Sequence, residues 1–293
     1  MFIDNPTIPT QLEVVLDQLH AIRQKSATAH SVKTLLQPSG LPDVNENSSQ
    51  AALHLRAARE LGLAAEDADG HLRLTYPIRE GKPSAKVAII DAFDRHVLSS
   101  PDLEPWFGRI YSYVICRGET GIPSEGGLRK TLCEQFNNAL PARIERTNPL
   151  NDTKLGQYVR WFTYVGLGWR DPSKRFIPDP TDRLLRSLPA IFESSRQMEA
   201  GAFMSAMALA CPELDGGALF LDAADDQYRA SDRVCTGALA MALRNLHDEE
   251  VIQLDCPKDS QGWSLERAGN VRDQHTLQSD RFDRVLYAEV ERK

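Results

Sequence analysis

Residues 49–75 read SQAALHLRAARELGLAAEDADGHLRLT. Apolar residues recur with helical spacing as far as Leu61, and Gly62 is well placed to end the helix because glycine accepts the left-handed conformation common at helix C-termini. The Asp-Gly pair at 69–70 is a strong hairpin turn, and the alternating residues 72–74 follow it. This stretch therefore predicts a helix followed by two short strands joined by a tight turn.

The same order of segments occurs twice more along the chain. Residues 152–181 read DTKLGQYVRWFTYVGLGWRDPSKRFIPDPT, and residues 231–265 read SDRVCTGALAMALRNLHDEEVIQLDCPKDSQGWSL. The expected strand pairs are 167–169 with 175–177, and 251–254 with 263–265. Helix, strand, turn and strand form the final half of a winged helix-turn-helix, so the pattern predicts an array of small recognition modules.

The segments between these stretches are mostly helical by pattern. Apolar residues at 12, 15, 16, 19 and 22 lie on one face of a helix, and residues 86–98 form another amphipathic helix. Residues 218–221 are interpreted as a short strand. The predicted fold class is mainly α with short β-hairpins (α+β), built as tandem winged helix-turn-helix units joined by helices. The predicted domains are 1–82, 83–182 and 183–293, the middle one basic and the last acidic.

The composition is that of an ordinary globular protein, with 42% hydrophobic and 26% charged residues among 293. No apolar run approaches the roughly 20 residues of a membrane helix. The N-terminus lacks the basic and then apolar pattern of a signal peptide. Five scattered cysteines, none at CxxC spacing, favour reduced thiols over a zinc site. These features predict a cytoplasmic protein with no membrane contact, no metal and no cofactor.

The net charge of −7 argues against a protein that coats nucleic acid through bulk electrostatics. The charge is unevenly distributed, however. Residues 1–104 carry 10 Arg and Lys against 14 Asp and Glu, residues 105–186 carry 13 against 8, and residues 187–293 carry 11 against 19. Only the middle third is basic, so phosphate contacts are expected there.

The predicted nucleic-acid-binding residues are the basic side chains that point away from each module's core. They are Arg56 and Arg59 in the first module, and Lys154, Arg160, Arg170, Lys174 and Arg175 in the middle one. His54 is a further outward candidate. The competing interpretation is an ordinary solvated face, and the neighbouring aromatics Tyr158, Trp161 and Trp169 fit a hydrophobic core better than a base-stacking surface. The third module carries carboxylates at 248–250 and at Asp255, which would repel phosphates, so it is interpreted as a docking surface.

Catalytic motifs are absent from the sequence. It contains no phosphate-binding loop, no dinucleotide fingerprint, no HExxH and no GxSxG. The acidic segment 213–226 leaves a metal site open, although caps and turns explain its carboxylates as well. No catalytic residue is therefore predicted. An enzyme with a dispersed site remains an alternative, and metal-dependent cleavage lost on mutation of Asp222 and Asp226 would support it.

Residues 58–75, ARELGLAAEDADGHLRLT, resemble a bacterial winged helix of the transcription-factor type. With FIPDPTDRLLRSLP at 176–189, PELDGG at 212–217 and the overall length, the chain resembles accessory proteins of bacterial anti-phage islands. Among these it resembles the DpdG family, of the 7-deazaguanine DNA modification and restriction cluster. The resemblance implies work beside helicases or ATPases on foreign DNA, and it supplies no catalytic motif.

The leading hypothesis is a non-enzymatic adaptor that binds double-stranded DNA weakly through the basic middle module and docks a protein partner through its acidic end. The alternatives are a pure protein-assembly module and a sequence-specific transcription regulator. A regulator would be expected to form a symmetric dimer with one strongly basic recognition helix. Neither feature is clear in this sequence.

Overall fold

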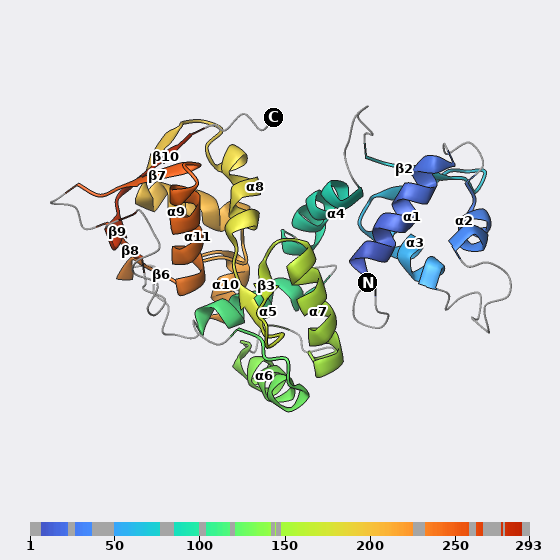
Figure 1. Cartoon of the computed structure of the whole chain (residues 1–293), viewed down its shortest axis with the longest axis horizontal. Coiled ribbons are helices and arrows are strands. Elements are labelled where there is room, and N and C mark those ends of the chain that lie inside the picture. The colour runs from blue at the N-terminus through green and yellow to red at the C-terminus, as the bar shows by residue number, and fades with distance from the viewer. Residues whose placement is uncertain are drawn as a thin grey trace. The chain divides into compact units, whose positions relative to one another are not determined.

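The computed structural model describes residues 7–22, 27–36, 50–76, 85–99, 104–117, 121–141, 144, 148–224, 232–257, 262–265, 277 and 279–288. The chain divides into two compact units, Met1–Glu104 and Pro105–Lys293. Helices dominate both, and the strands form small two- and three-stranded sheets (Figure 1). The mixed α+β class predicted from sequence is confirmed at this level. The predicted three-domain boundaries stay predictions.

The N-terminal unit contains three helices and a hairpin, here called the first repeat, followed by a further helical segment. The elements of the first repeat are α1 (Pro9–Ala21), α2 (Ala29–Leu36), α3 (Gln50–Glu60), β1 (Ala64–Glu66) and β2 (Leu72–Leu74). The predicted hairpin is confirmed, with Ala65 opposite Arg73. The helix expected over 86–98 is α4 (Ala85–Phe93), continued by the π-helical turn η1 (Asp94–Leu98).

The C-terminal unit begins with the second repeat, which has the same element order. Its elements are α5 (Phe107–Cys116), α6 (Gly126–Ala139), α7 (Asp152–Tyr164), β3 (Gly168–Arg170) and β4 (Phe176–Pro178). The predicted hairpin is confirmed one residue further along the chain, with Trp169 opposite Ile177. Tilted aromatic contacts fix α7 and the hairpin on α5, since the centroid of the Phe162 ring lies 4.5 Å from that of Phe107 and 5.4 Å from that of Phe176.

The third repeat keeps this order but contains insertions. Its common elements are α8 (Thr181–Ile191), β5 (Gln197–Glu199), α9 (Ala200–Ala210), α11 (Gly237–Asp248), β7 (Ile252–Asp255) and β10 (Arg284–Tyr287). The inserted elements are α10 (Ala218–Ala223), β6 (Val234–Cys235), β8 (Trp263–Leu265) and β9 (Arg281–Phe282). Figure 1 shows β6, β8 and β9 beside the β7–β10 ribbon. The insertions therefore add a second small sheet to this repeat.

The three repeats share one order of strand pairing. In the third repeat the sheet order is β5-β10-β7, so the last strand lies between the segment before the second helix and the strand after the third helix. In the first two repeats a single bridged residue replaces β5. Thr28 bridges His71 in the first repeat and Ile122 bridges Phe176 in the second. The described residues thus contain the same topology three times.

The turn that follows the third helix is also common to the repeats. A residue with positive φ ends each helix: Gly62 (φ 65), Gly166 (φ 72) and Glu250 (φ 57). The next N–H bonds back to the helix in a Schellman-type closure, with N···O distances of 2.8 Å for Leu63 to Ala58, 2.9 Å for Leu167 to Phe162 and 2.9 Å for Val251 to Leu246. The carbonyls of Leu63, Leu167 and Val251 then accept from Thr75, Asp179 and Ala288. Each hairpin is therefore attached to its helix in the same way.

Two predictions in the third repeat are wrong. The segments 251–254 and 263–265 do not pair with each other, because β7 pairs with β10, and β8 pairs with β6 and β9. Residues 218–221 belong to helix α10 and not to a strand. The reason is packing, because Leu219, Phe220 and Ala223 form the buried side of this helix against α5.

His54 is buried in the first repeat and does not point outward. Its Nε2 accepts the backbone N–H of Ile8 at 2.9 Å, and its Nδ1 lies 2.6 Å from the carbonyl oxygen of Gln50. A neutral ring with the proton on Nδ1 satisfies both contacts. Burial lowers the pKa of His54 below 6.5, against the smaller raising effect of the two backbone contacts.

The lowered pKa of His54 predicts that the N-terminal unit loses stability in mild acid. The unfolded chain takes up the proton near pH 6.5 and the folded chain resists it, so the stabilisation is complete above this pH and is lost as the pH falls below it. Urea unfolding followed by circular dichroism at about pH 7.5 and about pH 5.5 measures the difference in the free energy of unfolding between the two pH values. The difference should shrink in His54→Gln and persist in His20→Gln, which changes an exposed histidine of α1.

Candidate nucleic-acid interface

Helix α7 of the second repeat presents one polar face to solvent. The Asn151 side chain caps the helix by accepting the Lys154 N–H at 3.0 Å. The buried residues of α7 include Leu155, Tyr158 and Phe162. Thr153, Arg160 and Thr163 are exposed at helical spacing. Arg160 is therefore the cation that α7 offers to a ligand.

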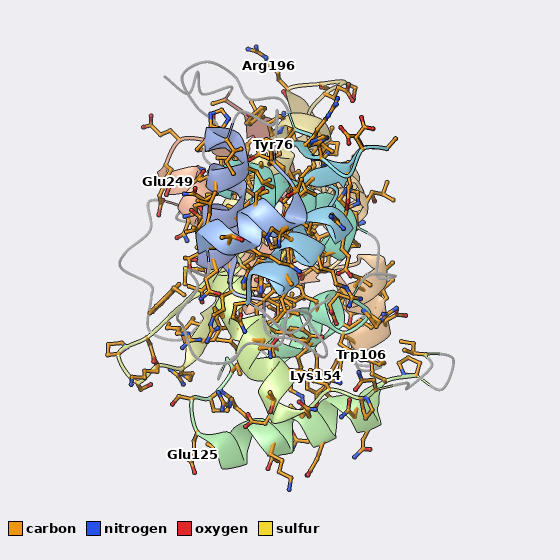
Figure 2. The ribbon with its side chains drawn as sticks, turned by 90° about the vertical axis from the view of Figure 1, so that its right-hand side faces the viewer. Tyr76, Trp106, Glu125, Lys154, Arg196 and Glu249 are labelled. Carbon is orange, nitrogen blue, oxygen red and sulfur yellow. The ribbon has the colours of Figure 1, made fainter. Side chains whose placement is uncertain are left out.

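Lys154 is buried, 3% exposed, and lies outside this polar face. Its Nζ donates to the carbonyl oxygens of Asn148 and Pro149, both at 3.0 Å, and to the Asn148 side chain. Trp106 donates from Nε1 to the same Asn148 carbonyl at 3.1 Å, and Figure 2 shows Trp106 and Lys154 close together. The lysine therefore holds the turn before α7 and takes no part in the interface proposed below.

The β3–β4 hairpin is held by Asp171. This residue exchanges backbone hydrogen bonds with Lys174 and Arg175, and its Oδ1 accepts the Arg175 N–H at 2.9 Å and the Ser173 hydroxyl at 2.7 Å. The Ser173 contact contributes most to lowering the pKa of Asp171. Ser124 also donates to the Ser173 carbonyl at 2.9 Å, which ties the turn to the segment before α6. The turn is therefore preorganised.

The hairpin carries three cations against the single carboxylate of Asp171. Arg175 pairs with Asp171 at 3.2 Å. Arg170 and Lys174 are exposed, and in the part of the chain that the structure describes no hydrogen bond or ion pair engages either side chain. The same holds for Arg160. These three side chains, Arg160, Arg170 and Lys174, are called the free cations below.

The first repeat has the same hairpin with different side chains. Asp67 makes the contacts of Asp171, accepting the His71 N–H on Oδ1 at 2.9 Å and the Gly70 N–H on its carbonyl at 3.0 Å. When the two aspartates are aligned, Glu66 stands where the second repeat has Arg170, and Gly70 where it has Lys174.

Three arginines of the first repeat are paired with neighbouring carboxylates. Arg56 pairs with Glu60 at 2.7 Å, Arg59 pairs with Glu66, and Arg73 pairs with Asp67 at 2.8 Å. Arg56 and Arg59, predicted as DNA-binding residues, therefore face solvent as ion pairs. The free cations belong to the second repeat.

Asp67, Asp69 and His71 come within 4.8 Å of one another, at a spacing that could hold a metal ion. The Asp67 carboxylate, however, already accepts the N–H groups of Asp69 and His71 and pairs with Arg73. The second repeat forms the same turn with serine and arginine at the last two positions. The cluster is therefore explained by the turn itself.

Helix α11, the third helix of the third repeat, presents no fully exposed residue between Gly237 and Asp248. Arg244 is half-buried and lies 3.7 Å from Asp280, just before β9, and Asn245 donates to Thr181 at 3.0 Å. Burial lowers the pKa of Arg244. The side chains of this helix are therefore partly or fully shielded, and Arg244 and Asn245 contact other elements of their own repeat.

The acidic segment 213–226 makes structural contacts in its described part. Glu213 pairs with Arg183 at 2.8 Å, and Asp222 pairs with Arg109 at 2.9 Å. Asp215 accepts the Thr236 backbone N–H at 2.7 Å and its hydroxyl at 2.9 Å, at the start of α11. Asp226 lies outside the described residues.

Comparison with protein families assigns the chain. Residues 3–260 match the model of the DpdG-like family, which is most of the sequence. The chain belongs to the DpdG-like family. Membership suggests involvement in a DNA modification system, in agreement with the resemblance seen in the sequence. No curated protein and no solved structure matches the chain.

Among the described residues, no helix has the length and apolar character to cross a bilayer.

Proposed function

We propose that this DpdG-like chain is a non-enzymatic adaptor that contacts double-stranded DNA through its second repeat. The topology supports a winged helix, because three helices are followed by a hairpin whose last strand pairs back to the segment before the second helix. In a winged helix, the third helix enters the major groove and the hairpin wing lies along the backbone or minor groove. Here these elements are α7 and β3–β4.

The observation that carries the proposal is the position of the free cations. Arg160 lies on α7, and Arg170 and Lys174 lie on the β3–β4 hairpin, where a winged helix meets DNA. Unpaired cations can exchange their counterions for phosphates without first giving up a carboxylate partner. The paired arginines of the first repeat would have to break an ion pair to do the same. The two repeats therefore differ in charge available to a ligand.

The third repeat supports the adaptor half of the proposal. Its third helix presents no fully exposed residue. Its insertion is bound to the second repeat through the Arg109–Asp222 pair and the hydrogen bond from Ser112 to the Glu213 carbonyl. A winged helix whose third helix is shielded in this way is better suited to binding a protein than to binding DNA. The proposed partners are proteins of the same defence system, a helicase or an ATPase among them. Co-purification with a tagged chain tests this, and recovery of the chain alone from cells that express the whole cluster would count against it.

Neutralising the free cations is expected to remove DNA binding. The variant Arg160→Gln/Arg170→Gln/Lys174→Gln should bind a short duplex at least roughly tenfold more weakly than the wild type at about 0.1 M salt, since three phosphate contacts are lost. Fluorescence polarisation with a labelled duplex measures the affinity.

The matched control is Arg56→Gln/Arg59→Gln in the first repeat. This variant should bind as the wild type does, because both arginines are paired with carboxylates in the folded chain. Equal binding by the wild type and the triple variant would rule out the proposed interface. Equal losses in the triple variant and the control would place binding over both repeats.

A further inference from the structure

Trp169 is an exposed aromatic side chain on the hairpin that carries two of the free cations. It is 49% exposed, whereas Trp106, Trp161 and Trp263 are at most 9% exposed. It faces Ile177 across the hairpin, on the side opposite to the buried Phe176. No ring contact engages it within the described residues. A large apolar surface is thus left in water on the same hairpin that carries Arg170 and Lys174.

The hairpin does not need this tryptophan to fold. The first repeat forms the same turn and strand pairing with Ala65 at the equivalent position, opposite Arg73. The backbone N–H groups that Asp67 and Asp171 accept at the turn are equivalent, so the backbone imposes no requirement for an aromatic ring. The presence of Trp169 is therefore better explained by a ligand than by the fold.

The chemical setting of Trp169 selects a nucleic acid. Arg170 is the next residue along β3, with its side chain on the opposite face of the strand, and Lys174 lies at the turn. Both cations are free to meet phosphates on either side of the hairpin. Proteins that hold unstacked bases combine an exposed aromatic ring with cations that bind the phosphate backbone, and this hairpin carries both. In an intact duplex the base faces are covered by their neighbours, so an indole ring can stack only where a base is unpaired, flipped out or at an end.

We propose that Trp169 stacks on an unpaired base, so that the interface prefers duplex DNA interrupted by unpaired bases over a continuous duplex. This proposal rests on the proposed function, because the same hairpin must first reach the phosphates. In this proposal the free cations provide the affinity for DNA, and Trp169 determines which DNA structure is preferred.

The test compares a short blunt duplex with the same duplex carrying a central run of mismatched bases. The wild type is expected to bind the mismatched duplex about tenfold more tightly, in the range that base–aromatic stacking provides. Trp169 also reports directly, because the other three tryptophans are buried. Its emission should be quenched by acrylamide in the free protein and protected in the complex with mismatched DNA.

Two variants separate the outcomes. Trp169→Ala, which places the first repeat's alanine in the second hairpin, should bind both DNAs equally. Trp169→Phe should keep part of the preference and lose the quenchable emission. A preference that survives in Trp169→Ala overturns the proposal. Equal binding of both DNAs by the wild type, with Trp169 still quenchable, also overturns it. Failure of the wild type to bind either DNA contradicts the proposed function instead.

Discussion

Replacing Arg183 with leucine is expected to lower the free energy of unfolding of residues 105–293 by about 3–5 kcal/mol. Arg183 is 4% exposed and Glu213 is fully buried. The guanidinium donates to Glu213 at 2.8 Å, to the Ser187 hydroxyl at 2.6 Å and to the Ala210 carbonyl at 2.8 Å. Removing it leaves a carboxylate and a carbonyl in a site that water does not reach. The loss arises from these groups, since an intact buried pair contributes little net stability.

The double variant Arg183→Leu/Glu213→Leu provides the control. It should recover much of the loss, because no uncompensated charge remains. Arg56→Leu, which breaks an exposed pair, should have a much smaller effect. Tryptophan fluorescence in a urea titration reports only the C-terminal unit, which contains all four tryptophans. An Arg183→Leu protein as stable as the wild type would contradict the assigned role of this pair.

Exchanging the hairpin residues between repeats is expected to abolish DNA binding without disturbing the fold. In Trp169→Ala/Arg170→Glu/Lys174→Gly, the second hairpin takes the residues that the first repeat carries on the same backbone. Two free cations disappear and a carboxylate is added, so duplex affinity should fall more than about tenfold at about 0.1 M salt. Polarisation binding and thermal unfolding of the same samples measure both effects.

The stability of the exchanged hairpin should not fall, because Lys174 is the strained residue. Its φ is 64°, and the equivalent Gly70 adopts 79° at little cost. Lys174→Gly alone should therefore raise stability, by up to about 1 kcal/mol, while it weakens DNA binding. A lysine kept in a conformation that glycine accepts more readily is consistent with a functional role. Unchanged binding by the exchanged variant, with its fold intact, would contradict that role.

Local signals in the sequence predicted the first two hairpins. Asp-Gly at 69–70 and the Asp171 turn set strand pairs that are close in sequence, and the structure confirms both. The prediction of the third hairpin was wrong because β7 pairs with β10. Strand β10 begins at Arg284, far beyond the turn-forming segment after Cys256. A local turn signal cannot reveal a pairing with so distant a strand. The prediction of a strand at 218–221 was also wrong, because short buried helices and short buried strands have similar compositions.

The candidate site was predicted in part. The structure places Arg160, Arg170 and Lys174 in solvent, where no described residue pairs with them, and it places Arg175 beside Asp171. Lys154 could not be recognised as structural, because its partners are carbonyls of a turn whose shape is not visible in the sequence.

Among the aromatics, Tyr158 and Trp161 are buried as expected, whereas Trp169 is exposed. A signal for Trp169 was present. When Asp67 is aligned with Asp171, Ala65 occupies the position of Trp169, which shows that the hairpin tolerates a small residue there.

The salt dependence of duplex binding by the wild-type chain tests the central claim most directly. If the three free cations each neutralise a phosphate, the logarithm of the association constant should fall linearly with the logarithm of salt concentration, with a slope of about −2.7. The slope should become shallower by about one unit for each cation neutralised. Binding that does not depend on salt, or a slope unchanged in the triple glutamine variant, would contradict the claim that these side chains hold DNA.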